Sequence, residues 1–115
     1  MAQSDTDPSP QRRTETKQAR LNNPSGWLYL TQHESVPVLV DALLDWPTDR
    51  EFTVQEFADH AGVVRQTVSK HLDILLDVRL IEEVPETYPQ RYRINNSSVT
   101  EELFGFNSAI NANAD

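Results

Sequence analysis

The segment GVVRQTVSKHL, residues 62–72, holds several side chains that hydrogen-bond well to nucleic acids. Arginine and glutamine can pair bidentately with guanine and adenine, and Ser, Thr and Lys contact bases or phosphates. The candidate DNA-binding residues here are Arg65, Gln66, Thr67, Ser69, Lys70 and His71. The same positions also fit the solvated face of an amphipathic helix, so the surrounding elements must favour one interpretation.

The residues around Gly62 predict two helices that meet at a turn. Thr53-Val-Gln-Glu56 is a capping box and opens the first helix. Ala58 is small enough to let a second helix cross, and Gly62 can adopt the positive φ of the turn. A second helix is expected over about residues 65–78. Its predicted buried residues are Val68, Leu72, Leu75 and Leu76. This spacing is typical of a helix–turn–helix.

Shorter patterns precede this pair of helices. WLYL, residues 27–30, is expected to dock on the domain as a helical turn or a strand. A helix is predicted over about residues 36–46, with Ser35 as its N-cap and Pro47 ending the run. Phe52 stands alone in a polar link and is consistent with a short strand.

The chain after the second helix reads as a hairpin and one more helix. Residues 80–84 and 90–95 alternate as strands around the loop PETYP, with Tyr92 and Ile94 on one side. Ser98-Val-Thr-Glu101 is a second capping box, which starts the last helix. The apolar residues that share a face of this helix are Val99, Leu103, Phe106 and Ile110. The cluster of Phe104, Phe106 and Ile110 suits packing or a dimer interface better than a ligand pocket.

Composition bounds the class of protein. The 115 residues include no cysteine and carry a formal charge of −8, with 18 Asp and Glu against 10 Lys and Arg. The absence of cysteine fits a reducing compartment, and no apolar run approaches the ~18 residues of a membrane span, so we expect a soluble cytoplasmic protein. The acidic excess suggests a cytosol of molar salt, or else an ordinary acidic protein.

The N-terminal residues 1–24 are predicted to be a disordered, polar and basic arm. Arg12, Arg13, Lys17 and Arg20 give residues 11–20 a net charge of +3. Such an arm is either inert or tracks DNA through its phosphates or the minor groove.

Residues 36–95 resemble a winged helix–turn–helix domain of the ArsR/MarR type, with TVSKHLDILLDVRLIEEV similar to those families' recognition helix and first wing strand. The flanking SGWLYLTQHESVPVLVDALLDWP and ELFGFNSAIN resemble small regulators of salt-loving archaea. The implied fold is mainly α with a small β-hairpin. It comprises a disordered arm over 1–24, a winged helix–turn–helix domain over 25–96 and a C-terminal dimerisation helix over 97–112.

The resemblance implies a homodimeric, sequence-specific transcriptional regulator whose helix 65–78 enters the major groove of double-stranded DNA. Arg91 and Arg93 either grip phosphates or pair with Glu82 and Glu83, and His71 either touches a phosphate or covers a packing edge. Two residues depart from the families' pattern. Val64 replaces the usual Ser or Thr N-cap, and Arg79 replaces a common glycine.

Other functions find little support. The sequence has no phosphate-cradling glycine loop and no nucleophile–base pair, so we expect no enzyme and no cofactor. Three scattered histidines without cysteine predict no metal site. The rival interpretation is a winged-helix module for protein–protein contact without DNA reading. The operator, any effector and the direction of regulation have no signature in the sequence.

Overall fold

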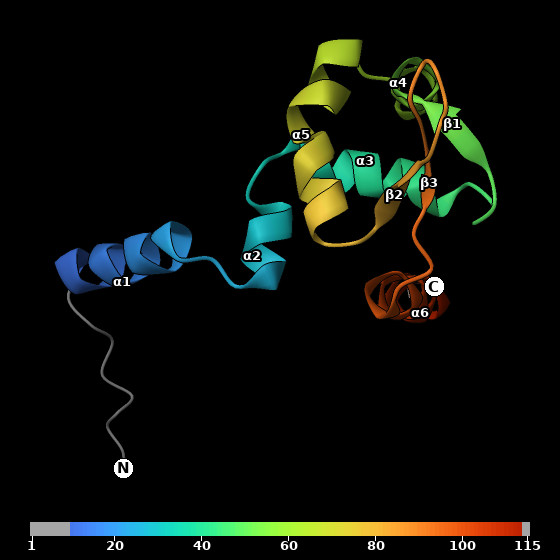
Figure 1. The fold of residues 1–115 in the computed structure, drawn as a ribbon. Helices are drawn as coiled ribbons and strands as arrows, with labels where there is room; N and C mark the ends of the chain where they lie inside the picture. Colours follow the sequence, from blue (N-terminus) through green and yellow to red (C-terminus); the bar gives the residue numbers. More distant parts are fainter. Residues whose placement is uncertain (1–9, 114–115) are drawn as a thin grey trace. The chain divides into compact units, whose positions relative to one another are not determined.

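The computed structural model describes residues 10–113, which form two compact units divided after Gln32 (Figure 1). The first unit holds α1 (Pro10–Asn22) and α2 (Gly26–Thr31). The second unit begins with α3 (Ser35–Leu44), β1 (Glu51–Thr53) and α4 (Val54–Ala61). It continues with α5 (Arg65–Asp77), β2 (Ile81–Val84), β3 (Arg91–Ile94) and α6 (Ser98–Ala112).

The second unit has the winged helix–turn–helix fold, mainly helical with a small antiparallel sheet. The strand order is β1-β3-β2, so the hairpin of β2 and β3 is extended by the short strand that contains Phe52. Phe52 pairs with Tyr92, and Ile81 pairs with Ile94. The alternation predicted for the hairpin is confirmed, because Tyr92 and Ile94 are buried while Arg91 and Arg93 are half-buried on the opposite face.

The core lies where α3, α4 and α5 pack together against this sheet. Leu39 of α3, Phe57 of α4 and Leu75 of α5 are completely buried, as are Phe52 and Val68. Phe52 and Phe57 meet edge to face, with ring centroids 5.2 Å apart. The apolar stripes read from the sequence therefore become one shared core that fixes the positions of α4 and α5.

Two helix caps differ from the sequence prediction by one residue. Ser35 lies inside α3, because Glu34 already has helical dihedral angles and forms the N-cap without a side-chain bond. The last helix is capped by Ser97 instead of Ser98. The Ser97 hydroxyl accepts a hydrogen bond from the Thr100 amide at 3.3 Å and donates one to the Arg79 carbonyl at 2.6 Å. This second bond ties the start of α6 to the end of α5, which favours Ser97.

The expectation of disorder is wrong for residues 10–22, which form α1; residues 1–9 lie outside the described residues. Pro10 suits a first helical turn, and Gln, Arg, Lys, Glu and Ala are good helix formers. No residue of α1 is buried, so its helicity comes from local preferences. WLYL takes the helical alternative as α2, capped by Ser25. The division after Gln32 falls later than the boundary expected after residue 24.

Candidate nucleic-acid interface

The turn between α4 and α5 is built as the sequence predicts. Gly62 has φ 76°, and the amides of Gly62 and Val63 both donate to the Ala58 carbonyl, at 2.9 and 3.0 Å. Thr53 and Glu56 form the predicted capping box at the start of α4. Val64 is the N-cap of α5 and offers no side-chain bond, as its residue type implies. The turn therefore presents the first residues of α5 at one end of the domain.

The polar face of α5 is open to solvent. Arg65, Gln66, Ser69 and Lys70 are exposed, and Thr67 is half-buried. Among residues 10–113, no carboxylate lies within 4.0 Å of the Arg65 guanidinium or the Lys70 ammonium. Unpaired cations beside amide and hydroxyl groups on one helix face are suited to contacting bases and phosphates.

His71 lies in the core, which corrects the expectation that it touches DNA. Its exposed fraction is 6%, and its ring lies 5.3 Å from that of His33. Burial lowers the pKa of His71, and the neighbouring charges of His33 and Lys70 lower it further. The buried stripe of α5 runs through Val68, His71 and Leu75, a helical spacing of three and four residues. Leu72 and Leu76, expected in that stripe, are half-buried at its edge.

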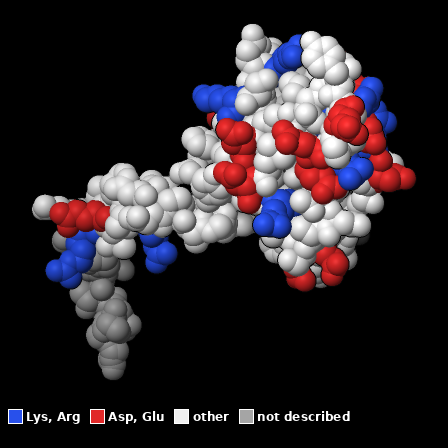
Figure 2. Space-filling model, in the orientation of Figure 1, with Lys and Arg blue, Asp and Glu red and all other residues white. Residues whose placement is uncertain are grey.

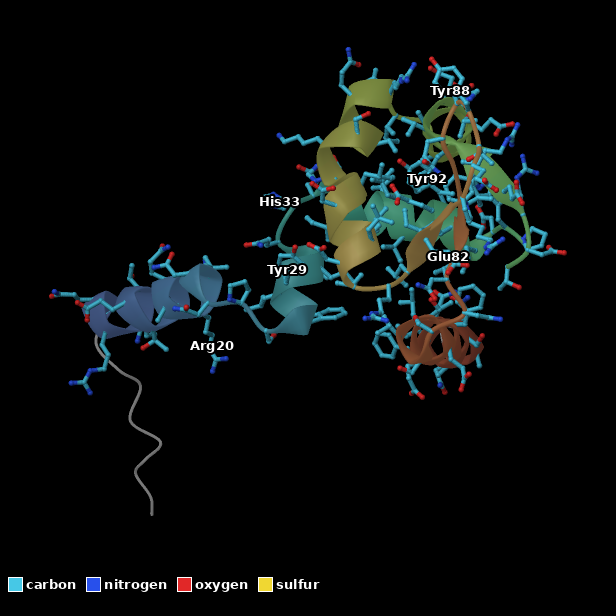
Figure 3. All side chains as sticks on the ribbon, viewed as in Figure 1. Arg20, Tyr29, His33, Glu82, Tyr88 and Tyr92 are labelled. Atoms are coloured by element: carbon cyan, nitrogen blue, oxygen red, sulfur yellow. The ribbon has the colours of Figure 1, made fainter. Side chains whose placement is uncertain are left out.

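The wing is the hairpin of β2 and β3 together with its loop, residues 81–94. Its loop is internally braced, because the Thr87 hydroxyl donates to the Val84 carbonyl and accepts from the Arg91 amide, both at 2.9 Å. The Gln90 side chain also donates to the Val84 carbonyl at 2.9 Å. This braced loop holds Tyr88 in solvent with its surface fully exposed, at the wing tip labelled in Figure 3. Tyr88 was not among the residues predicted to bind DNA. Its position between turn residues in the hairpin loop was the signal that could have identified it as an exposed aromatic side chain.

The wing arginines are engaged in ion pairs. Arg93 Nε donates to Glu82 Oε2 across the two strands at 2.7 Å, and this bond raises the pKa of Arg93. Arg91 Nη1 lies 3.6 Å from Glu56 Oε1, so its partner is on α4 rather than on the neighbouring strand. The backbone hydrogen bond from Thr53 lowers the pKa of Glu56, which keeps that partner ionised. Arg93 therefore has one of the two carboxylate partners expected on the neighbouring strand, whereas Arg91 is paired with a carboxylate outside the hairpin.

A cleft of about 310 Å³ separates the wing from the starts of α4 and α5. Its lining residues are Thr53, Val54, Gln55, Arg65, Pro89, Gln90 and Tyr92. Figure 1 shows the amino end of α5 and the loop of the wing at the same end of this unit. Arg65 and the loop of the wing thus line one concave surface.

Features of other functional classes do not emerge from residues 10–113. No group of three or more His, Asp or Glu residues in that range could hold a metal ion. None of the helices in the same range is both long and apolar enough to cross a bilayer.

Comparison with known proteins bears on the fold. No protein-family model matches this chain, and no curated protein sequence matches it. Among solved structures, the chain is similar to the crystal structure of NolR from Sinorhizobium fredii, with a TM-score of 0.55 and 21% sequence identity. The similarity covers 91% of this chain and 95% of NolR. At this identity the likeness concerns the fold, and it supports the winged-helix architecture described above.

Proposed function

We propose that this protein is a sequence-specific DNA-binding transcription regulator that reads the major groove with α5. The observation that carries the proposal is the exposed face of α5, where Arg65 and Lys70 have no carboxylate partner among the described residues. The fold shared with NolR, a winged-helix transcription regulator, supports the assignment at a general level. The winged helix also serves protein–protein contact, so the site and not the fold must decide.

Five polar residues in the first half of α5 have a role in this proposal. Arg65, at the amino end of the helix, is placed to form a bidentate contact with guanine, and Gln66 can pair with adenine. Thr67, Ser69 and Lys70 contact phosphates or base edges along the groove. Arg91 and Arg93 stay paired with carboxylates, so the exposed ring of Tyr88 is the wing's contact with the DNA backbone.

The proposed regulator is a homodimer that pairs through α6. Val99, Phe106 and Ile110 expose 42%, 53% and 50% of their surfaces on this helix. A second copy of the chain would cover this apolar face and place two α5 helices on one duplex. Light scattering in molar KCl is expected to give the mass of two chains, and a monomer at micromolar concentration would contradict the dimer.

We also propose that the protein works in concentrated salt. Residues 33–115 carry six Lys or Arg against fifteen Asp or Glu, a net charge of −9. Figure 2 shows several clusters of acidic side chains on this unit's visible face. At molar salt the Debye length is about 3 Å, so distant carboxylates no longer repel DNA and the contacting cations decide binding.

The test begins with selection of the preferred site from a random duplex library by the full-length protein. Arg65→Ala is then expected to lose about 1–3 kcal/mol of binding free energy and to relax the preference at one base pair. Arg50→Ala is the matched control, because it removes one arginine that lies over Trp46, 4.7 Å from the ring centroid, and is not part of α5. Equal site preference and equal affinity for the two variants would overturn the proposal.

A further inference from the structure

The exposed helix α1 gathers its cations on one face. Arg12, Arg13, Lys17 and Arg20 are four of the ten Lys and Arg residues of the chain, although α1 has only 13 residues. At about 100° per residue these four positions fall within an arc of about 140°, and Glu15 lies outside it. Figure 2 shows basic side chains along one side of α1, and Figure 3 shows Arg20 projecting from the helix.

The opposite face of α1 is polar, and its one charged side chain is the carboxylate of Glu15. Gln11, Thr14, Gln18 and Asn22 fall within an arc of about 80° on that side. The Thr14 hydroxyl donates to the Pro10 carbonyl at 3.0 Å, and the Gln18 amide donates to the Asn22 side-chain oxygen at 2.8 Å. Because no residue of α1 is buried, the basic face is not explained by packing.

We propose that this basic face is a nucleic-acid surface, which binds the phosphates of a duplex beside the site read by α5. The inference rests on the proposed function, which supplies DNA as the partner. It adds a second DNA contact, which does not depend on the base sequence. The spacing of the four cations over successive turns fits a row of phosphates, which lie along a helical backbone. Phosphate contacts position a protein without reading bases, so this surface supplies affinity and not specificity.

A membrane does not fit the same surface. Helices that lie on bilayers need an apolar face opposite their cations, and α1 has only Ala19 and Leu21 besides Pro10. An acidic protein surface is the other polyanion within reach, since residues 33–115 of this chain carry −9. The acidic side chains of residues 33–115 are interrupted by paired arginines, whereas a duplex offers two unbroken rows of phosphates, so DNA is the better partner.

Anion binding also has a conformational signature. Arg13 and Lys17 stand four residues apart and Lys17 and Arg20 three apart, so like charges repel on the same face. A helix of this length is marginal by itself in water. Phosphates that neutralise the basic face remove the repulsion, so we expect the helix signal of the full chain to rise when DNA is added.

The experiment measures binding of the full-length protein to a 30-base-pair duplex of random sequence, over a series of KCl concentrations. The variant Arg12→Gln, Arg13→Gln, Lys17→Gln, Arg20→Gln removes the basic face. Its slope of log affinity against log KCl is expected to be more positive than that of the wild type by about 3.6, from about 0.9 for each phosphate lost. The rise in helix signal with DNA is expected to vanish.

A second variant keeps the charge and spreads it around the helix: Arg13→Gln, Lys17→Gln, Thr14→Arg, Gln18→Lys. With two cations left on the original face, its slope is expected to change by about half as much. If this variant binds like the wild type, charge alone suffices and the inference is wrong. If neutralising all four cations changes nothing, or strengthens binding because α1 had docked on the acidic unit, the inference is also overturned.

The selected operator separates this inference from the proposed function. Neutralising α1 is expected to weaken binding to operator and random duplex by the same factor and to leave the preference between them unchanged. A wild-type protein without any preferred sequence, whose binding still depends on the four cations, would contradict the proposed function and support the surface on α1.

Discussion

Helix α5 and the wing both carry arginines, yet the structure places those arginines in different electrostatic settings. Arg65 is exposed and has no carboxylate within 4.0 Å among residues 10–113. Arg93 is held at 2.7 Å by Glu82, whose position directly opposite is fixed by the strand register. A cation that already has a partner gains less from a phosphate, because the existing pair must first be broken. An arginine therefore indicates a contact with DNA only when the side chains around it are also known.

Helix α5 has a buried face and an exposed face, and they should differ in how much a substitution changes stability. The largest expected effect is on the buried face. Leu75 is completely buried, so Leu75→Ala should lower the free energy of unfolding by about 2–5 kcal/mol. The exposed Ser69 serves as control, since Ser69→Ala should change it by less than about 0.5 kcal/mol. Urea denaturation measures both; equal effects would show that the two faces are not divided as described.

The next prediction uses the pH dependence of the buried face. The pKa of His71 is lower in the folded state than its ordinary value of 6.5, mainly because of burial. The unfolded chain therefore takes up a proton that the folded chain resists. The contribution of His71 to the free energy of unfolding is fully present above about pH 6.5 and is lost as the pH falls below that value.

Denaturation at pH 7.5 and 5.5 measures this effect, with His71→Gln as the variant and His60→Gln as the control. Unlike His71, His60 is exposed, and its ring nitrogen lies 2.9 Å from the Ala42 carbonyl near the end of α3. The wild type and His60→Gln should lose stability on acidification, and His71→Gln should lose less. A wild type that is equally stable at both pH values would exclude a buried neutral His71.

A substitution of Arg79, which lies between α5 and the wing, is expected to raise stability, by less than the losses predicted for the buried face. Its φ is 65°, a left-handed conformation that strains residues with a side chain. The amides of Arg79 and Leu80 donate to Leu76 and Leu75, which is the hydrogen-bond pattern of a Schellman turn. Arg79→Gly should relieve the strain and raise stability by about 0.5–1 kcal/mol, whereas Arg79→Ala should give no gain. Thermal unfolding distinguishes them, and a loss with glycine would contradict the strain.

The smallest expected effect tests the wing arginine directly. Glu82→Gln removes the carboxylate that pairs with Arg93 and leaves the guanidinium available for phosphate. Affinity for DNA should rise by about two- to fivefold, the equivalent of a weak surface ion pair. Glu83→Gln removes the same charge one residue away and serves as control. An equal rise for both variants would mean that general charge, and not the release of Arg93, is responsible.

Much of the fold could be predicted from the sequence because its signals are local. Thr53 with Glu56, and Gly62 four residues after Ala58, form the capping box and left-handed turn that were predicted. The strand alternation at Tyr92 and Ile94 was likewise visible, since burial follows a period of two.

What the sequence could not predict depends on residues distant in the chain. The hydroxyl of Ser97 bonds to the carbonyl of Arg79, and this selected the N-cap of α6. His71 is buried beside His33, which lies in the connection between α2 and α3, so its polar type misled the assignment of its face. The pairing of Arg91 with Glu56 joins β3 to α4 and has no local pattern either.

The most direct measurement is DNA binding by two double variants in the same buffer, using the operator selected by the wild-type protein. Arg65→Ala with Lys70→Ala is expected to weaken binding by about 30-fold or more, since each contact is worth at least about 1 kcal/mol. Arg91→Gln with Arg93→Gln removes the same number of charges from the wing and is expected to weaken binding by less than about threefold. Circular dichroism of each variant confirms that it remains folded. Equal losses for the two variants, or a larger loss for the wing variant, would contradict the account that α5 carries the DNA contact.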